Sequence, residues 1–246
     1  MASKWRIDLS PLRENREFRR LFIASTISFF GSMATYVAMP FQMAQITGSY
    51  VHVGMIGVAE LGPLIFFGLY GGVLADRLDR KRLVLVTEFA CVAVAGILIL
   101  NSKLEQPQTA PLYIAAFLFS CLDSLQRPSF DALIPQLVSP KQLPAVTALR
   151  SLRGNANQLL GPAVGGVLIA QFGPVAAYTL DALTFFVSAI LIFGMQSVPN
   201  RRTVEESVIG ELRAGLRYAM SRRDLLGTYL IDTVAMVMAY PTALLP

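Results

Sequence analysis

Gly72-Val-Leu-Ala-Asp-Arg-Leu-Asp-Arg-Lys-Arg-Leu-Val84 is a strongly charged stretch that separates two long apolar runs. Each run, about residues 51–75 and 83–101, is long enough for a helix to cross a bilayer, because a hydrocarbon core about 30 Å thick needs roughly 20 apolar residues. The whole chain has 54% hydrophobic and only 15% charged residues, whereas a soluble domain has about 25% charged residues. The stretch is therefore predicted to be a short loop between two membrane-spanning helices.

Six spans and the start of a seventh are predicted, so the expected fold class is an all-α membrane protein. The fourth and fifth spans contain too many polar residues to be assigned by hydropathy alone, and the loops and motifs around them place them. The linker after the sixth span has the pattern of an amphipathic helix, which fits a helix on the membrane surface and an ordinary soluble helix equally well. The spans are about residues 21–46, 51–75, 83–101, 111–138, 145–170 and 174–195. The predicted segments are a tail over 1–20, a six-helix bundle over 21–195, a linker over 196–224 and a seventh segment over 225–246 that looks truncated.

The basic residues indicate which side of the membrane each loop faces. Of the 21 lysines and arginines, only Lys103 lies in a loop on one side, and three arginines lie within spans. All the others lie in the N-terminal tail or follow the second, fourth or sixth span. Because basic loops stay in the cytoplasm, we expect a multi-pass protein of the bacterial inner (plasma) membrane with a cytoplasmic N-terminus. The net charge of +5 is thus an orientation signal and does not indicate a nucleic-acid partner.

The charged stretch resembles the signature loop of the major facilitator superfamily, Gly-x-Leu-Ala-Asp-Arg-x-Gly-Arg-Lys-x-x-Leu, in the same place between the second and third spans. In that superfamily the glycine permits close helix packing, and the charges hold the loop in the cytoplasm and latch a gate. Two positions depart, because Asp79 replaces a glycine and Val84 a leucine. A generic basic loop is the alternative. The resemblance implies a gating motif formed by Gly72, Asp76, Arg77, Arg80 and Lys81.

The fifth span contains Gly161-Pro-Ala-Val-Gly-Gly166, which resembles the Gly-Pro-x-x-Gly-Gly core of a motif found in proton-coupled antiporters. The proline removes a backbone donor and bends the helix, and the glycines permit close packing. The longer motif has further glycines upstream, where this chain has Ala148 and Asn157. A packing kink without functional meaning is the alternative. The residues of the motif are Gly161, Pro162, Gly165 and Gly166.

Other stretches resemble the siderophore and macrolide (multidrug) exporter branch of the superfamily. They include Asn15-Arg-Glu-Phe-Arg-Arg-Leu21, Arg127-Pro-Ser129 and Glu211-Leu-Arg-Ala-Gly-Leu-Arg-Tyr218. The resemblance covers essentially the whole chain. Members of the superfamily have twelve spans in two six-helix halves, so it implies an N-terminal half plus part of a seventh helix.

Charged side chains inside a span cost at least about 2.5 kcal/mol at the bilayer centre, so each needs a partner or a function. Glu60 in the second span and Asp123 in the fourth are the candidates for proton coupling, and a hydrogen-bonded packing acid is the alternative for Glu60. Asp123, Arg127 and Asp131 are spaced i, i+4, i+8, so they share a helix face and can pair internally. Glu88, near the start of the third span, is expected to pair with the loop arginines. The acid of the sixth span, Asp181, is given no partner.

Polar residues of the first, fourth and fifth spans are expected to form the wall of a substrate cavity. Small polar, aromatic and methionine residues follow helical spacing in the first span and suit a bulky amphipathic substrate. Helix packing through the serines explains the pattern of the first span equally well. For the charged residues the alternative is a purely structural ion cluster near the inner surface, especially for Asp131 and Arg150. The cavity candidates are Ser28, Ser32, Tyr36, Arg127, Arg153 and Asn157.

The leading functional hypothesis is secondary active efflux of a drug-like or siderophore-like small molecule, coupled to protons and working by alternating access. An importer of a small solute on the same fold is the first alternative. A non-transporting half that assembles with another chain is the second, with a C-terminal half or a second copy as its partner. An enzyme is not expected, since no nucleophile, metal-ligand or phosphate-binding constellation is present. No cofactor and no metal are expected, and the partners are the lipid bilayer, the substrate and protons.

Overall fold

The structure of the protein, a computed structural model, describes residues 8–77, 79–196, 221–222, 227–228 and 231, and it describes side chains in these ranges except for residues 68–77. The chain divides into two units, Met1–Arg202 and Thr203–Pro246. The first unit holds the predicted six-helix bundle. The linker helix and the seventh span that the sequence predicts lie outside the described residues.

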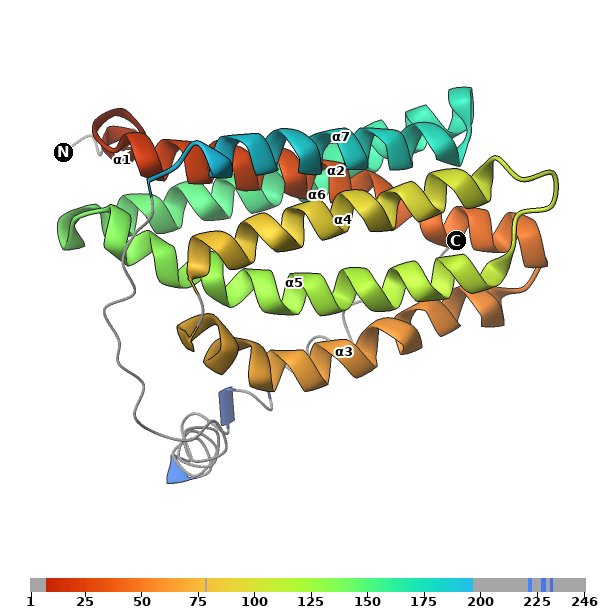
Figure 1. The fold of residues 1–246 in the computed structure, drawn as a ribbon, viewed down its shortest axis with the longest axis horizontal. Coiled ribbons are helices and arrows are strands. Elements are labelled where there is room, and N and C mark those ends of the chain that lie inside the picture. The colour runs from red at the N-terminus through yellow and green to blue at the C-terminus, as the bar shows by residue number, and fades with distance from the viewer. Residues whose placement is uncertain (1–7, 78, 197–220, 223–226, 229–230, 232–246) are drawn as a thin grey trace. The chain divides into compact units, whose positions relative to one another are not determined.

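The ordered elements between residues 8 and 196 are all helical, which confirms the predicted fold class (Figure 1). Only α2, the first part of α3, α4 and α7 are apolar enough to be recognised as membrane spans by composition. The other two long helices of the described bundle are the predicted fourth and fifth spans, whose polar residues lower their hydropathy. The elements are α1 (Ser10–Glu14), α2 (Arg16–Thr47), α3 (Tyr50–Arg77), α4 (Arg80–Ser102), α5 (Thr109–Leu137), the 3-10 turn η1 (Pro140–Gln142), α6 (Leu143–Phe172) and α7 (Pro174–Phe193).

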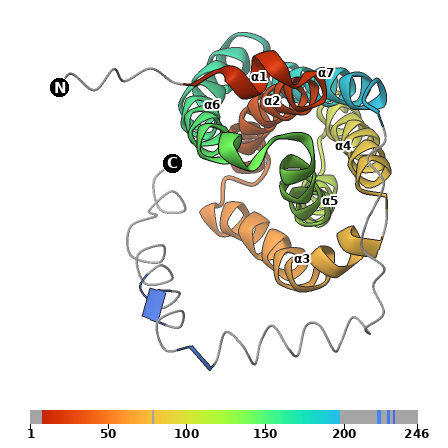
Figure 2. The ribbon, with the colours of Figure 1, turned by 90° about the vertical axis from the view of Figure 1, so that its left-hand side faces the viewer.

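Helix α2 lies at the centre of one side of the bundle, between α6 and α7 (Figure 2). Helix α7 also packs against α4, α4 packs against α5, and α5 packs against α3. The helices therefore follow the spatial order α6–α2–α7–α4–α5–α3, which differs from their order along the chain. This order places α2, α4, α5 and α7 around a common interior.

The core consists of two separate apolar clusters. One contains Ala34 and Met43 of α2 together with Leu98 of α4, Leu112 of α5 and Tyr178 of α7. The other cluster lies nearer the N-terminus of α2. Its main members are Phe18, Leu21, Val84, Leu133, Val146 and Ile192. Burial of apolar surface is a main source of packing energy. Between the two clusters this apolar packing is interrupted, so other contacts must hold the helices together there.

One end of the bundle gathers the N-terminus of α2, the α3–α4 turn, η1 and the C-terminus of α7 (Figure 1). We call it the basic end, because the described loop residues there include Arg80, Lys81, Arg82 and Lys141. Lys103 follows α4 at the opposite end. The basic connections thus meet at one end, as the sequence predicted; that this end is cytoplasmic stays a prediction.

Candidate functional site

A layer of buried polar side chains separates the two apolar clusters. On each of α2, α4, α5 and α7, buried polar residues lie in the stretch where the two clusters meet, together with the buried apolar residues Cys91, Phe185 and Ala189. Counting about 1.5 Å per helical residue, Glu88 lies about 12 Å along α4 from the basic end, which is within the depth of a bilayer core. We call this set the polar layer, and it comprises Ser25, Ser28, Thr35, Thr87, Glu88, Ser124, Gln126, Ser129, Asp181, Thr184 and Ser188.

Glu88 of α4 is one of two acids at the centre of the polar layer, and none of its surface is exposed. Its Oε1 accepts a hydrogen bond of 2.7 Å from Nε2 of Gln126 on α5. Its Oε2 is buried and has no hydrogen-bond partner among the described residues, and the same is true of Oγ of Ser188. The hydroxyl groups of Ser188 and Ser28 face this carboxyl group from α7 and α2.

Asp181 of α7 is the second acid, and it too is fully buried. Its Oδ2 accepts a hydrogen bond of 2.6 Å from Oγ1 of Thr35, and Oγ of Ser32 lies 3.4 Å from its Oδ1. The Ser32 hydroxyl is also 3.0 Å from the backbone oxygen of Ser28. Helix α2 therefore supplies both side chains that bond this acid.

Neither acid has a cationic partner among the residues that the structure describes. Within the described part of the chain, no lysine, arginine or histidine forms an ion pair with Glu88 or Asp181, and the two acids interact electrostatically with each other. The expected pairing of Glu88 with the loop arginines is not formed by Arg80 or Arg82, and the side chain of Arg77 lies outside the described set. Arg80 instead donates to the backbone oxygen of Ala132, 3.0 Å away, because that carbonyl lies near its own level at the basic end.

The sequence of α7 carries a pattern of polar residues from which this buried site could have been predicted. Asp181, Thr184 and Ser188 are spaced i, i+3, i+7, so they form a polar stripe on a helix that is otherwise among the most apolar in the chain. A matching stripe of serines and a threonine runs along α2. Two polar stripes on apolar helices indicate a shared buried interface, which is where the structure places them.

Close contact between α2 and α7 depends on Gly31. A Cβ atom at this position would overlap the side chain of Thr184 and lie 3.0 Å from the Cα of Asp181. The absence of a side chain therefore brings the α2 backbone near enough for Thr35 and Ser32 to reach the Asp181 carboxyl group.

Two glycines of the antiporter-like motif have a similar role between α6 and α2. A Cβ at Gly161 would overlap the side chain of Met33, and one at Gly165 would lie 2.8 Å from the Cα of Ala34. Gly166 has nothing within 4 Å, and Pro162 is half-buried inside the helix. The motif thus packs α6 tightly against α2, as expected of its glycines, whereas its role in transport stays a prediction.

Three of the expected cavity residues lie between helices. Ser28 and Asn157 are buried, and Nδ2 of Asn157 donates to the backbone oxygen of Thr26 on α2 at 2.9 Å. Arg153 donates to Oγ of Ser25, and its guanidinium group lies over the Phe22 ring, 5.9 Å from the centroid. The side chains of Asn157 and Arg153 connect α6 to α2, so packing is their observed role here.

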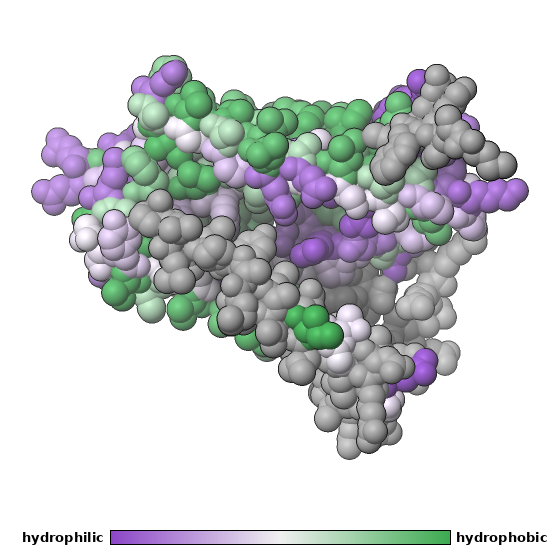
Figure 3. Space-filling view, turned by 180° about the vertical axis from the view of Figure 1, so that it is seen from behind, coloured by the Kyte–Doolittle hydropathy of each residue, from purple (hydrophilic) through white to green (hydrophobic). Residues whose placement is uncertain are grey.

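Four other expected site residues, together with Asp131 of α5, are exposed or half-buried, and we call this set the open face: Tyr36, Glu60, Asp123, Arg127 and Asp131. Tyr36, Asp123, Arg127 and Asp131 are exposed, and Glu60 is half-buried without a side-chain partner in the described ranges. Asp131 pairs with Arg150 of α6, so the internal pairing expected for it within α5 is wrong. Asp123 is attracted by Arg127 without forming an ion pair with it. Figure 3, which views the side opposite to Figure 1, shows hydrophilic surface in the middle of that side below a band of hydrophobic surface.

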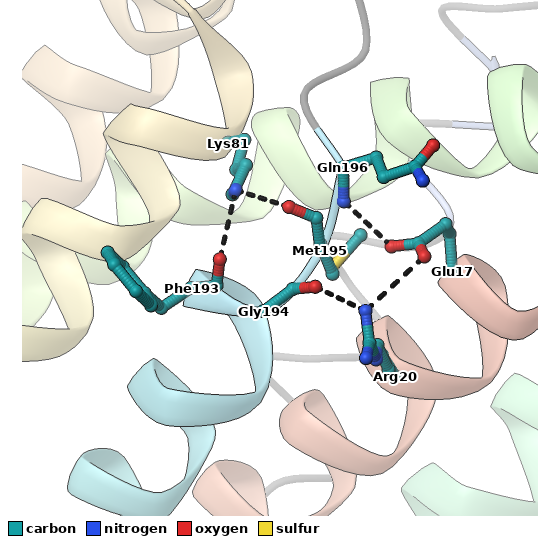
Figure 4. A network of polar contacts seen from close by, with 7 residues as sticks. All are labelled: Glu17, Arg20, Lys81, Phe193, Gly194, Met195 and Gln196. Atoms are coloured by element: carbon teal, nitrogen blue, oxygen red, sulfur yellow. Dashed lines mark hydrogen bonds and ion pairs between the residues drawn. The ribbon is translucent and has the colours of Figure 1, made fainter.

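The basic end carries a network that holds the C-terminus of α7. Lys81 donates to the backbone oxygens of Phe193, at 3.1 Å, and Met195. Arg20 donates to the backbone oxygen of Gly194 and pairs with Glu17 (Figure 4). Cations at a helix C-terminus satisfy free carbonyl groups and favour the helix dipole. Two cations from α2 and α4 thus fix the inner end of α7.

The expected gating motif is only partly visible in side-chain detail. Arg80 and Lys81 bind the ends of α5 and α7, as described above. Gly72, Asp76 and Arg77 lie in the part of α3 whose side chains are outside the described set. Asp79, which departs from the superfamily pattern, caps α4 by accepting from the backbone nitrogen of Arg82 at 3.0 Å, a role that aspartate performs well and glycine cannot perform with a side chain.

The comparisons with known proteins agree with this architecture. Residues 7–246 match the family described as transmembrane secretion effector. The chain belongs to this major facilitator family. It is 30% identical over 244 residues to the enterobactin exporter EntS of Shigella boydii serotype 18 (strain CDC 3083-94 / BS512). It has the same identity to the enterobactin exporters of Escherichia coli O1:K1 / APEC and of Escherichia coli strain SMS-3-5. Each alignment covers 96% of this chain and 58% of the relative, so this major facilitator chain spans little more than half the length of these relatives.

Proposed function

We propose that the chain forms the N-terminal half of a proton-coupled exporter of a drug-like or siderophore-like small molecule in the bacterial inner membrane, working by alternating access. The observation that carries this proposal is the pair of exposed charged residues Asp123 and Arg127 midway along α5. Charged side chains at this depth do not face lipid. They therefore require an aqueous cavity, which a transporter has between its two halves.

The open face has the chemistry of a wall for an amphipathic substrate. Arg127 offers a cation, and Tyr36 is 53% exposed on α2 and offers an aromatic surface. Asp123 and Glu60 are the acids on this face that can exchange protons with the water of a cavity. The named relatives are exporters, which favours efflux over the import of a small solute.

A partner is required to close such a cavity. The alignments cover 58% of each relative, and a cavity between two six-helix halves needs the second half. We propose that a C-terminal half, or a second copy of the chain, supplies it. The basic end is then cytoplasmic, because basic loops remain on that side.

Transport into inside-out proteoliposomes tests the proposal. The chain is reconstituted alone, and also fused to the C-terminal half of the Escherichia coli enterobactin exporter, with enterobactin as the probe. We expect accumulation driven by an imposed pH gradient with the fusion and little with the chain alone. The intact Escherichia coli exporter is the matched control. If that control accumulates enterobactin and neither preparation does so above empty vesicles, the proposed function is wrong.

A further inference from the structure

We propose that Glu88 and Asp181 form a proton-binding site inside the bundle, in which Oε2 of Glu88 carries the proton. This inference rests on the proposed function, because it names the residues through which that function uses protons. It adds a site to the acids of the open face. The polar layer supplies the geometry, and four observations support the assignment.

The first observation is the surroundings of the two acids. Both are fully buried, on the neighbouring helices α4 and α7, and they interact electrostatically. Their hydrogen bonds come only from neutral groups, namely the Gln126 amide and the Thr35 and Ser32 hydroxyls. Two carboxylates that share a site without a cation do not both ionise, because repulsion adds to the cost of burying each charge.

The second observation identifies the oxygen that holds the proton. Oε1 of Glu88 accepts from Gln126, while Oε2 has no donor among the described residues. A proton on Oε1 would face the hydrogens of the Gln126 amide, so the proton of a neutral Glu88 lies on Oε2. A protonated Oε2 becomes a donor, and the Ser188 hydroxyl, which faces the same carboxyl group and also lacks a partner in the described set, is the acceptor.

The third observation distinguishes the two acids. Oδ2 of Asp181 accepts a short bond of 2.6 Å from Thr35, and its Oδ1 is near the Ser32 hydroxyl. The donor on Oδ2 stabilises an anion, while the single hydrogen of the Ser32 hydroxyl is shared between Oδ1 of Asp181 and the Ser28 backbone oxygen. The pair is therefore best described as one neutral and one anionic carboxyl group that together hold a single proton.

The fourth observation concerns the other titratable groups around the pair. Cys91 of α4 interacts electrostatically with both acids and also with Asp123 of α5; α2 contributes the hydroxyls of Ser28, Ser32 and Thr35. Asp123 is exposed on the open face and lies one helical turn from Gln126. A proton from cavity water can thus reach the pair at the level of Asp123, and it returns to that water when it leaves.

Coupling follows from the position of α2. This helix supplies the donors to Asp181, and it contacts α7 at Gly31 and α6 at Gly161 and Gly165. If α2 shifts along α7 during alternating access, Asp181 loses donors and its affinity for the proton rises. The movement of α2 and the protonation of the acid pair are then linked, because a proton that binds one conformation more tightly shifts the equilibrium toward that conformation.

Infrared difference spectroscopy of the full chain in lipid nanodiscs tests the site without requiring transport. We expect a carbonyl band of a protonated carboxyl group at neutral pH that persists into mildly alkaline buffer. Glu88→Gln should remove it, whereas Asp131→Asn, which changes an exposed acid of the same bundle, should leave it unchanged. A band that is absent in the wild type, or that survives in both Glu88→Gln and Asp181→Asn, overturns the proposal.

Gln126→Leu tests the same site with both acids intact. Removing the donor to Oε1 disfavours the anion, so the band should persist to a higher pH than in the wild type. The expected increase in proton affinity is about tenfold, which corresponds to about 1.4 kcal/mol. Titration at or below the wild-type pH contradicts the assignment to Glu88. Circular dichroism checks that each variant remains helical.

The transport assay separates this site from the proposed function. In the fusion protein, Glu88→Gln should still exchange substrate across the membrane but lose most of its response to a pH gradient. Loss of transport in the wild type itself would reject the exporter while leaving the infrared result to decide the proton site. An unchanged gradient response in Glu88→Gln would reject the coupling role of the pair.

Discussion

The open face and the polar layer both place acids within the depth of a bilayer, but they balance those acids differently. On the open face Asp131 pairs with Arg150 and Asp123 is attracted by Arg127. In the polar layer Glu88 and Asp181 have only amide and hydroxyl partners. Apart from Glu60, the acids of the open face lie near a cation, whereas the two acids of the polar layer have neutral donors among the described residues.

This contrast has a physical basis. Burying an ion pair requires removing two charges from water, and their mutual attraction often fails to offset that cost. A carboxyl group that binds a proton loses its charge and avoids the cost. The absence of arginine and lysine beside Glu88 and Asp181 in the described ranges is therefore what a site for reversible protonation needs.

The largest effect is expected from Gly31→Val, which should separate α2 from α7. The new side chain would overlap Thr184 and press on the backbone at Asp181. Overpacking of this kind costs about 1–3 kcal/mol, and we expect a loss near 3 kcal/mol in unfolding free energy. Denaturant titration of helicity in detergent measures it. Gly96→Val on α4, where nothing lies within 4 Å of the glycine, is the control, and an equal loss there would contradict the close contact at Gly31.

Most of the fold could be predicted from the sequence, because length and hydropathy are local properties. The six spans, for example the one near 174–195, correspond to helices with closely similar bounds, here Pro174–Phe193. The fourth and fifth spans are polar in places, so their prediction depended on the loops on either side of them. Their polarity is itself structural, since α5 supplies three residues of the open face and α6 supplies Arg150, the partner of Asp131.

The site was harder to predict, because it depends on which helices are neighbours. The spatial order α6–α2–α7–α4–α5–α3 brings Asp181 beside residues almost 150 positions earlier in the chain. Position along a single helix instead suggested that Glu88 lies close enough to the loop arginines to pair with them. Spacing within α5 likewise suggested internal pairing for Asp131, whereas α6 supplies its partner, Arg150.

Thr35→Val should have the next largest effect, because it removes the strongest donor to Asp181. A hydrogen bond to a charged acceptor contributes about 1.5–3 kcal/mol, against about 0.5–1.5 kcal/mol for a neutral one. We expect a loss in the upper range, measured by the same denaturant titration. Thr26→Val, which removes a bond of 2.6 Å to the backbone of its own helix, is the matched control. Equal small losses would show that Asp181 is not the anionic member of the pair.

A smaller effect is expected from Lys81→Met at the basic end. Lys81 binds two carbonyl groups at the C-terminus of α7, and a cation at a helix C-terminus contributes about 0.3–1 kcal/mol. The loss should weaken as salt is added, because the site is partly exposed. Lys103→Met, at the opposite end, should change stability by less. A larger effect of the Lys103 change would contradict the capping role assigned to Lys81.

The smallest effect is expected from Asp131→Asn, and it sharpens the contrast between the two regions. The Asp131–Arg150 pair is exposed on both sides, and exposed ion pairs contribute about 0–1 kcal/mol. A double-mutant cycle with Arg150→Gln should give a coupling energy in that range that falls with ionic strength. The same aspartate-to-asparagine change at Asp181 should be insensitive to salt, since counterions do not reach a fully buried group. A salt-insensitive coupling at Asp131 would mean that the open face excludes water as the polar layer does, and the distinction between the two kinds of acid would then be lost.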